Sequence, residues 1–170
     1  MILNILYFIL PAALANMMPI FVKKLNIFGY PLDFGLKFGK ERVLGENKTF
    51  RGVIFAILGA LFIVYLQSYF SYGLIDFSKY NLIYLGFLFG FGVMFGDALG
   101  SFVKRRIKIK PGESFYVADQ IDSILGLFLV FYWYLDLSLL FWVYTLIVWF
   151  LGHLILKYVG YLLKLENKKI

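Results

Sequence analysis

Five long apolar stretches, separated by polar segments, form the dominant pattern along the chain. They cover about residues 1–22, 52–75, 82–103, 119–135 and 139–156, and the last continues toward the C-terminus. About 20 apolar residues in a helix cross the roughly 30 Å hydrocarbon core of a bilayer, where a helix satisfies its own backbone polar groups. The pattern therefore predicts an all-α, polytopic integral membrane protein with five transmembrane helices.

The composition agrees with this pattern and excludes several kinds of site. Of 170 residues, 62% are hydrophobic and 16% are charged, whereas soluble domains are about half apolar and one-quarter charged. The chain has no cysteine, which rules out disulfides, thiolate metal sites and cysteine nucleophiles. The single histidine, His153, cannot build a histidine-rich metal centre and is expected to be a packing or interfacial residue.

The basic residues gather on one side of the predicted bundle. Sixteen of the 17 lysines and arginines lie around residues 23–51 and 104–118 and near the C-terminus, whereas Lys79 lies on the other side. The positive-inside rule makes the basic side cytoplasmic. We therefore expect a single membrane-embedded domain over residues 1–170, with an external N-terminus and a cytoplasmic C-terminus. Lipid headgroups account for these charges, so nucleic-acid binding is not expected.

Small and aromatic residues predict how the helices pack. Gly92, Gly96 and Gly100 repeat every four residues, so this face lets a neighbouring helix approach closely and also permits a homodimer. Asn16, which is flanked by two prolines, indicates either a kinked packing helix or a point of lipid access. Four aromatic residues near the external ends of the last two stretches predict a belt at headgroup depth: Tyr132, Trp133, Tyr134 and Trp142.

Carboxylates stand at the cytoplasmic ends of the third and fourth stretches. Asp97 lies before the end of an apolar stretch, where a carboxylate is costly and requires a partner or a cation. On a helix, Asp97, Ser101 and Lys104 share one face, and Asp119 and Asp122 share another. We expect these two faces to converge at the cytoplasmic surface.

Two interpretations of this cluster remain open at this stage. Mg²⁺ prefers one or two carboxylates together with phosphate oxygens and water, and lysine or arginine neutralises the remaining phosphate charge. Lys104, Arg105 and Lys110 supply such charges, and Pro111 with Gly112 predicts a turn through which backbone approaches a ligand. The alternative interpretation is a structural network of aspartate–arginine pairs.

A second polar cluster precedes the second apolar stretch on the same side. It contains Asn47, Lys48, Thr49 and Arg51. If Thr49 caps the following helix, free backbone N–H groups favour an anion there, and Lys48 and Arg51 add to that preference. The cluster therefore indicates either part of a phosphate-binding site or a simple helix cap.

Taken in order, these residues resemble the signature of CTP-dependent phosphatidate cytidylyltransferases. The matching positions are Gly96, Asp97, Ser101, Lys104, Arg105, Lys110, Pro111, Gly112, Asp119 and Asp122. The run PLDFG at residues 31–35 and the run NKT at residues 47–49 resemble the archaeal branch, the CDP-archaeol synthases. This resemblance extends over nearly the whole chain.

The resemblance implies a nucleotidyl transfer at the cytoplasmic face of the cell membrane. CTP and an isoprenoid-ether lipid phosphate, 2,3-bis-O-(geranylgeranyl)glyceryl 1-phosphate, would give the CDP-activated lipid and pyrophosphate. By this resemblance Asp97 and Asp119 hold Mg²⁺, and Lys104 and Arg105 are catalytic. The remaining candidate site residues are then assigned to the nucleotide or the lipid phosphate: Asn47, Lys48, Thr49, Arg51, Ser101, Lys110, Gly112 and Asp122.

The chain also departs from the bacterial pattern. There, His-Gly-Gly follows the Pro-Gly pair, whereas Glu113 and Ser114 follow it here, and Gln120 stands where that pattern has arginine. The metal assignment therefore rests on Asp97 and Asp119, whose positions match. The competing function is a small ion-coupled transporter or channel. Two observations argue against it: the polar residues cluster at one end of the predicted bundle, and no inverted repeat is visible in the sequence.

Overall fold

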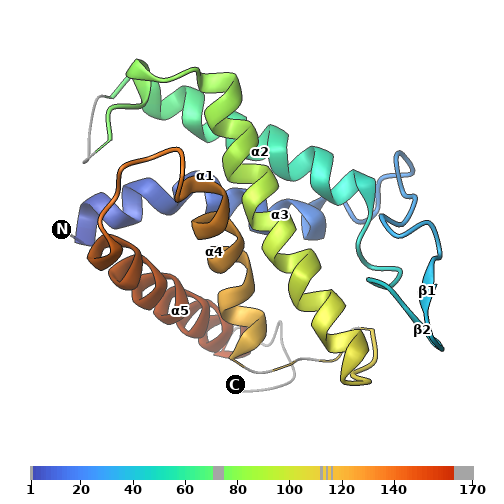
Figure 1. Ribbon diagram of the computed structural model, residues 1–170. Helices are drawn as coiled ribbons and strands as arrows, with labels where there is room; N and C mark the ends of the chain where they lie inside the picture. Colours follow the sequence, from blue (N-terminus) through green and yellow to red (C-terminus); the bar gives the residue numbers. More distant parts are fainter. Residues whose placement is uncertain (1, 71–74, 112, 114, 116, 163–170) are drawn as a thin grey trace.

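The computed structural model describes residues 2–70, 75–111, 113, 115 and 117–162, and this part of the chain is largely helical (Figure 1). Its helices are α1 (Ile2–Phe21), α2 (Phe50–Ser68), α3 (Leu82–Arg106), α4 (Ala118–Phe131) and α5 (Leu139–Leu162). A short 3-10 helix, η1 (Phe77–Lys79), precedes α3, and two strands, β1 (Lys37–Phe38) and β2 (Glu41–Arg42), lie between α1 and α2.

Each predicted apolar stretch contains one helix, but the helices differ in length. Three of them, α1, α2 and α3, are long and apolar enough to cross a membrane. The fourth, α4, has 14 residues and ends at Phe131, earlier than the predicted Leu135. In α5 the apolar helical segment of Leu139–Ile155 is shorter than those three helices. The expectation of helical structure is thus confirmed, and the count of five spans stays a prediction.

Helix α3 lies at the centre of the bundle, with α2 on one side and α4 on the other (Figure 1). Glycines set the distance between α3 and α4. A Cβ atom on Gly126 would lie 2.3 Å from the carbonyl oxygen of Gly92 and 2.4 Å from the backbone nitrogen of Gly96. The glycine face predicted in α3 therefore packs against α4 of the same chain, with backbone close to backbone.

Aromatic side chains from α1, α3, α4 and α5 pack together in the core. The Phe8 ring packs against the rings of Phe89, Phe131 and Trp142, at centroid distances of 5.3, 6.1 and 5.8 Å. Trp142 is only 4% exposed and packs inside the bundle, so the ring does not face lipid there, and its place in a belt at headgroup depth stays a prediction. The face of α5 that carries Trp142 points into the bundle. Tertiary packing determines which face of a helix is buried, and local composition does not reveal it.

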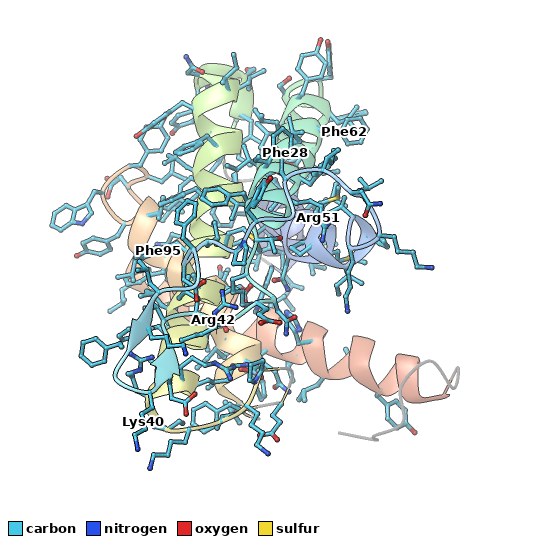
Figure 2. The ribbon with its side chains drawn as sticks, turned by 90° about the vertical axis from the view of Figure 1, so that its right-hand side faces the viewer. Phe28, Lys40, Arg42, Arg51, Phe62 and Phe95 are labelled. Carbon is cyan, nitrogen blue, oxygen red and sulfur yellow. The ribbon has the colours of Figure 1, made fainter. Side chains whose placement is uncertain are left out.

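The loop between α1 and α2 forms a small β-hairpin, which the sequence did not predict. Strands β1 and β2 pair antiparallel, and Gly39 takes a positive φ of 70° in the turn. Arg106 at the end of α3 donates to the Arg42 carbonyl oxygen at 2.7 Å and lies over the Phe38 ring at 5.0 Å. Figure 2 shows Arg42 beside the body of the molecule and Lys40 at its edge. These contacts fix the hairpin beside the end of α3.

Candidate functional site

A polar cavity of about 250 Å³ lies where the end of α3, the loop after it and the segment before α2 meet. Its lining residues are Leu44, Gly45, Asn47, Lys48, Ser101, Lys104, Arg105, Pro111, Glu113 and Asp119. Six of these are residues that the sequence assigned to the site: Asn47, Lys48, Ser101, Lys104, Arg105 and Asp119. The two polar clusters, separated by about a third of the chain, therefore form the walls of one cavity.

Asp97 and Lys48 join these two clusters directly. The Lys48 ammonium donates to both carboxylate oxygens of Asp97, at 2.6 Å each. The two side chains retain 28% and 23% of their exposure, so the pair is largely shielded. A carboxylate on an apolar helix requires a partner, and Lys48, which lies 49 residues earlier in the chain, supplies it.

Asp119 and Lys104, which both line the cavity, form a second pair, whereas Asp97 itself is not among the lining residues. The Lys104 ammonium lies 2.9 Å from Asp119 Oδ1, and Asp119 Oδ2 accepts the backbone N–H of Phe115 at 2.8 Å. Asp119 thus fastens the first turn of α4 to the segment before it. Both aspartates are paired with lysine, whereas the alternative interpretation predicted arginine as the partner, and the magnesium interpretation stays a prediction.

Arg105 is the buried cation of the cavity. Arg105 is only 4% exposed, and its Nη1 donates to the carbonyl oxygen of Ile109 at 2.5 Å. Its Nε is buried and has no hydrogen-bond partner among the described residues. Buried donors are normally satisfied, so this nitrogen can still donate to an acceptor that enters the cavity. A Cβ atom added to Gly45 would lie 3.9 Å from this nitrogen. Glycine at this position therefore leaves the space beside Arg105 Nε without a side chain.

Other predicted site residues lie outside the cavity lining. Thr49 is the N-cap of α2 and accepts the backbone N–H of Gly52 at 3.3 Å, so the cap interpretation is confirmed. Arg51 donates to the Leu25 carbonyl oxygen and lines a separate surface hollow with Phe28. Figure 2 shows Arg51 away from the hairpin, close to Phe28. The Lys110 side chain is exposed, and Gly112 lies outside the described residues.

Asp122 borders a second, apolar groove between α3 and α4. This groove has a volume of about 290 Å³, and Asp119 lines both it and the polar cavity. Its apolar wall includes Leu99, Val103 and Leu129, which are between 42% and 52% exposed. A polar cavity and an apolar groove thus meet at one carboxylate.

Asp33 is a structural residue of the site that the site prediction left out. Its Oδ1 accepts from Arg42 at 2.5 Å and from the Gly35 backbone N–H at 3.0 Å, and its Oδ2 accepts from the backbone of Leu44 and Gly45. Burial alone would raise the pKa of this carboxyl, but these hydrogen bonds outweigh it and hold the pKa well below its usual range. Asp33 thereby shapes the wall of the cavity. The Asp-Phe-Gly turn in the run 31–35 was the available signal.

Comparison with solved structures shows where this arrangement occurs. A structure of an intramembrane enzyme for archaeal membrane lipids biosynthesis superimposes with a TM-score of 0.73 and 27% identity, over 87% of this chain and 89% of that one. This likeness, together with the long apolar helices of the chain, identifies the chain as a multi-pass membrane protein.

Relatives of known family match the chain over most of its length. The CDP-archaeol synthase of Methanococcus maripaludis (strain C5) is 36% identical over 182 residues, covering 100% of this chain and 96% of its own. The CDP-archaeol synthase of Sulfolobus acidocaldarius is 32% identical and covers 98% and 96%. The family model of the CarS-like CDP-archaeol synthases matches residues 1–169. The chain therefore belongs to the CDP-archaeol synthase family, as its motifs indicated.

Proposed function

We propose that this protein transfers CMP from CTP to an isoprenoid-ether lipid phosphate, giving a CDP-activated lipid and pyrophosphate. The observation that carries this proposal is the polar cavity, with three cationic side chains and two carboxylates in its lining, beside an apolar groove. A triphosphate requires the first feature and an acyl- or isoprenyl-type chain requires the second. Family membership supplies the specific nucleotide and lipid.

The reaction needs no protein nucleophile. An oxygen of the lipid phosphate attacks the α-phosphorus of CTP, and the bond from that phosphorus to the β-phosphate oxygen breaks. The main obstacle is repulsion between two anions, which fixed positive charge reduces. Lys104 and Arg105 line the cavity and would stabilise the departing pyrophosphate. Much of the acceleration would come from such electrostatics and from positioning.

The lysine–aspartate pairs suit an exchange of partners when CTP binds. Lys48 and Lys104 line the cavity while they hold Asp97 and Asp119, respectively. As the triphosphate enters, each ammonium exchanges a carboxylate oxygen for a phosphate oxygen. The exchange keeps the lysine charges neutralised and releases both carboxylates for a cation.

Asp97 and Asp119 are the residues that would hold Mg²⁺. Among the described residues there is no group of three or more histidine, cysteine, aspartate or glutamate side chains that could hold a metal by itself. One or two carboxylates with substrate phosphates are the usual Mg²⁺ donor set, so the residues fit a cation that arrives with the nucleotide. Bound there, Mg²⁺ would neutralise charge on the phosphates and make the α-phosphorus more electrophilic.

The site belongs at the cytoplasmic surface of a five-span bundle in this proposal. The excess of basic residues on one side supports that orientation, and the cavity lies among them. The phosphate of the lipid would lie at headgroup depth near Asp119, with the first part of its chains in the α3–α4 groove. The transporter hypothesis has no support from the family, and the charged pairs described above lie at one end of α3.

A purified-protein assay tests this function. The protein in detergent is incubated with radiolabelled CTP, Mg²⁺ and the geranylgeranyl-ether lipid phosphate, and lipid-linked CMP and pyrophosphate are measured. We expect the two products in equal amounts. Asp97→Asn and Asp119→Asn should each abolish turnover while membrane insertion is retained. Asp76→Asn, which disturbs the pair with Lys79 and the hydrogen bonds from Ser78 but no residue of the cavity lining, should leave turnover unchanged. Failure to form lipid-linked CMP with any lipid phosphate would contradict the proposal.

A further inference from the structure

A chain of polar side chains connects three helices beside Asp122. His153 on α5 contacts Asn16 on α1, with 3.5 Å between His153 Nε2 and Asn16 Nδ2. Asn16 Oδ1 in turn lies 3.2 Å from the Ser123 hydroxyl on α4. The same hydroxyl lies 3.2 Å from Asp122 Oδ1, which also accepts the Ser123 backbone N–H at 2.6 Å.

This polar chain requires an explanation because its surroundings are apolar. Ser123 is 4% exposed, and its packing neighbours on α4, Ile124 and Leu127, are buried in the hydrophobic core. Polar groups in such a position cost free energy unless they are hydrogen-bonded, and in membrane helices they commonly serve a function. Neither Asn16 nor His153 lines the polar cavity or the apolar groove.

The direction of the hydrogen bonds follows from the donor count. The Ser123 hydroxyl has one proton and two acceptors within reach, Asn16 Oδ1 and Asp122 Oδ1. Turning the Asn16 amide end for end moves no other atom and resolves this conflict, because its NH₂ then donates to Ser123 and its oxygen accepts from His153. Each member then donates to the next, and the chain ends on the Asp122 carboxylate.

Asp122 occupies the space between α3 and α4 that glycines leave open. A Cβ atom on Gly100 would lie 2.4 Å from Asp122 Oδ2, so this oxygen lies against α3 one turn after Asp97. Asp122 also interacts electrostatically with Asp97 and Lys48. One carboxylate oxygen is thus held by Ser123, and the other lies against α3 beside Gly100.

We propose that Ser123, Asn16 and His153 are positioning residues, which act on the cytidylyl transfer by fixing the orientation of the Asp122 carboxylate. The inference rests on the proposed function, since it concerns that same reaction. The chain holds Asp122 Oδ1 and includes no residue of the polar cavity lining. It therefore affects the chemical step more than the binding of CTP.

Substitutions at Ser123 separate positioning from packing. Ser123→Ala removes the hydroxyl and should lower kcat by about tenfold, the size expected for one hydrogen bond to a charged group, with little change in KM for CTP. Ser123→Thr keeps the hydroxyl and should restore most of the activity. Thr145→Val is the matched control, because it removes a buried hydroxyl whose one partner among the described residues is the Phe141 carbonyl of its own helix. The control should lower the melting temperature without lowering kcat.

Combining variants tests whether the residues act as one chain. The double variant Ser123→Ala with Asn16→Ala should lose no more kcat than Ser123→Ala alone, because both changes interrupt the same connection. Asp122→Asn should lose at least as much as either. Independent losses that multiply, an unchanged kcat in Ser123→Ala, or a milder loss in Asp122→Asn would each overturn the inference. A wild-type protein that forms no lipid-linked CMP would instead overturn the proposed function.

Discussion

Lys48 holds both carboxylate oxygens of Asp97 at 2.6 Å and so connects the segment before α2 to the middle helix of the bundle. The pair neutralises a carboxylate on an otherwise apolar helix, and it also occupies the oxygens that a cation would use. Lys48 is therefore both a structural partner of Asp97 and a competitor of the metal. These two roles predict opposite effects when Lys48 is removed.

The first prediction is that Lys48→Met binds divalent cations more tightly but turns over more slowly. Loss of the ammonium leaves Asp97 free for the cation, so Mn²⁺ affinity without CTP should rise by about fivefold, as a pair worth about 1 kcal/mol implies. Turnover should fall by about a hundredfold, because one fixed positive charge near the phosphates is missing. Mn²⁺ titration followed by electron paramagnetic resonance measures the first effect, and the CTP assay measures the second.

Lys79→Met provides the control for this prediction. Lys79 is 77% exposed and pairs with Asp76 at 3.5 Å, away from the cavity. Its removal changes the net charge equally but should alter neither Mn²⁺ affinity nor turnover. If Mn²⁺ bound Lys48→Met no better than wild type, Asp97 would not be the carboxylate that receives the cation.

The second prediction concerns Asp33, which organises the hairpin segment. Asparagine at this position would place an NH₂ group against N–H donors, because both carboxylate oxygens accept from donors. Asp33→Asn should cost about 1.5–3 kcal/mol of local stability, the range for hydrogen bonds to a charged group. The amides of Leu44 and Gly45 should then exchange hydrogen at least about tenfold faster, as mass spectrometry can measure.

The same carboxylate predicts how stability depends on pH. The pKa of Asp33 is lower in the folded than in the unfolded protein, where it is about 3.9. Its contribution is therefore complete above pH 4 or so and is lost as the pH falls through the folded value. Protection of the Leu44 amide should be constant from pH 5 to 8 and decrease in stronger acid. Asp33→Asn should lack this acid-dependent loss, and an equal loss in both proteins would contradict the assignment.

The sequence predicted the elements of the site better than their contacts. Helical spacing placed Asp97, Ser101 and Lys104 on one face, and the structure has Ser101 and Lys104 on the cavity wall. The partner of Asp97 could not be read from spacing, because Lys48 lies in a separate segment and only the fold brings them together. Local patterns determine which residues share a helix face, whereas tertiary packing determines which faces meet.

Arg51 and Asp33 illustrate why the sequence did not predict all contacts of the site. Asp33 lies in the segment between α1 and α2, where a few backbone dihedral angles decide the direction of each side chain. Arg51, in the first turn of α2, contacts this segment at Leu25. Positive φ angles at Phe34 and Gly35 direct this segment around the Asp33 carboxylate. A basic residue near a helix N-terminus suggests a phosphate ligand. In the structure Arg51 donates to the Leu25 carbonyl oxygen, and its phosphate contact stays a prediction.

The third prediction tests the close contact of α3 and α4, which holds Asp97 and Asp119 near one cavity. Gly126→Ala would place a methyl group 2.3 Å from the Gly92 carbonyl oxygen, and both sides of the contact are backbone. The helices must separate, so we expect a loss of about 1–3 kcal/mol in stability and a much larger loss of turnover. Gly152→Ala, which meets nothing within 4 Å, should change neither. Thermal unfolding in detergent and the CTP assay measure the two effects.

The fourth prediction concerns the apolar groove. Leu99→Trp would fill part of the space between α3 and α4, and Leu99 is 42% exposed there. If the lipid chains lie in this groove, KM for the geranylgeranyl-ether lipid phosphate should rise by about tenfold or more, since a displaced chain loses about 0.8 kcal/mol per buried CH₂ group. KM for CTP should not change, because the nucleotide lies in the polar cavity. Leu58→Trp on α2, a residue 51% exposed that lines neither space, should behave like wild type. A water-soluble analogue with short chains should be used equally well by Leu99→Trp and wild type, whereas an equal loss with this analogue would mean that the substitution distorts the catalytic cavity.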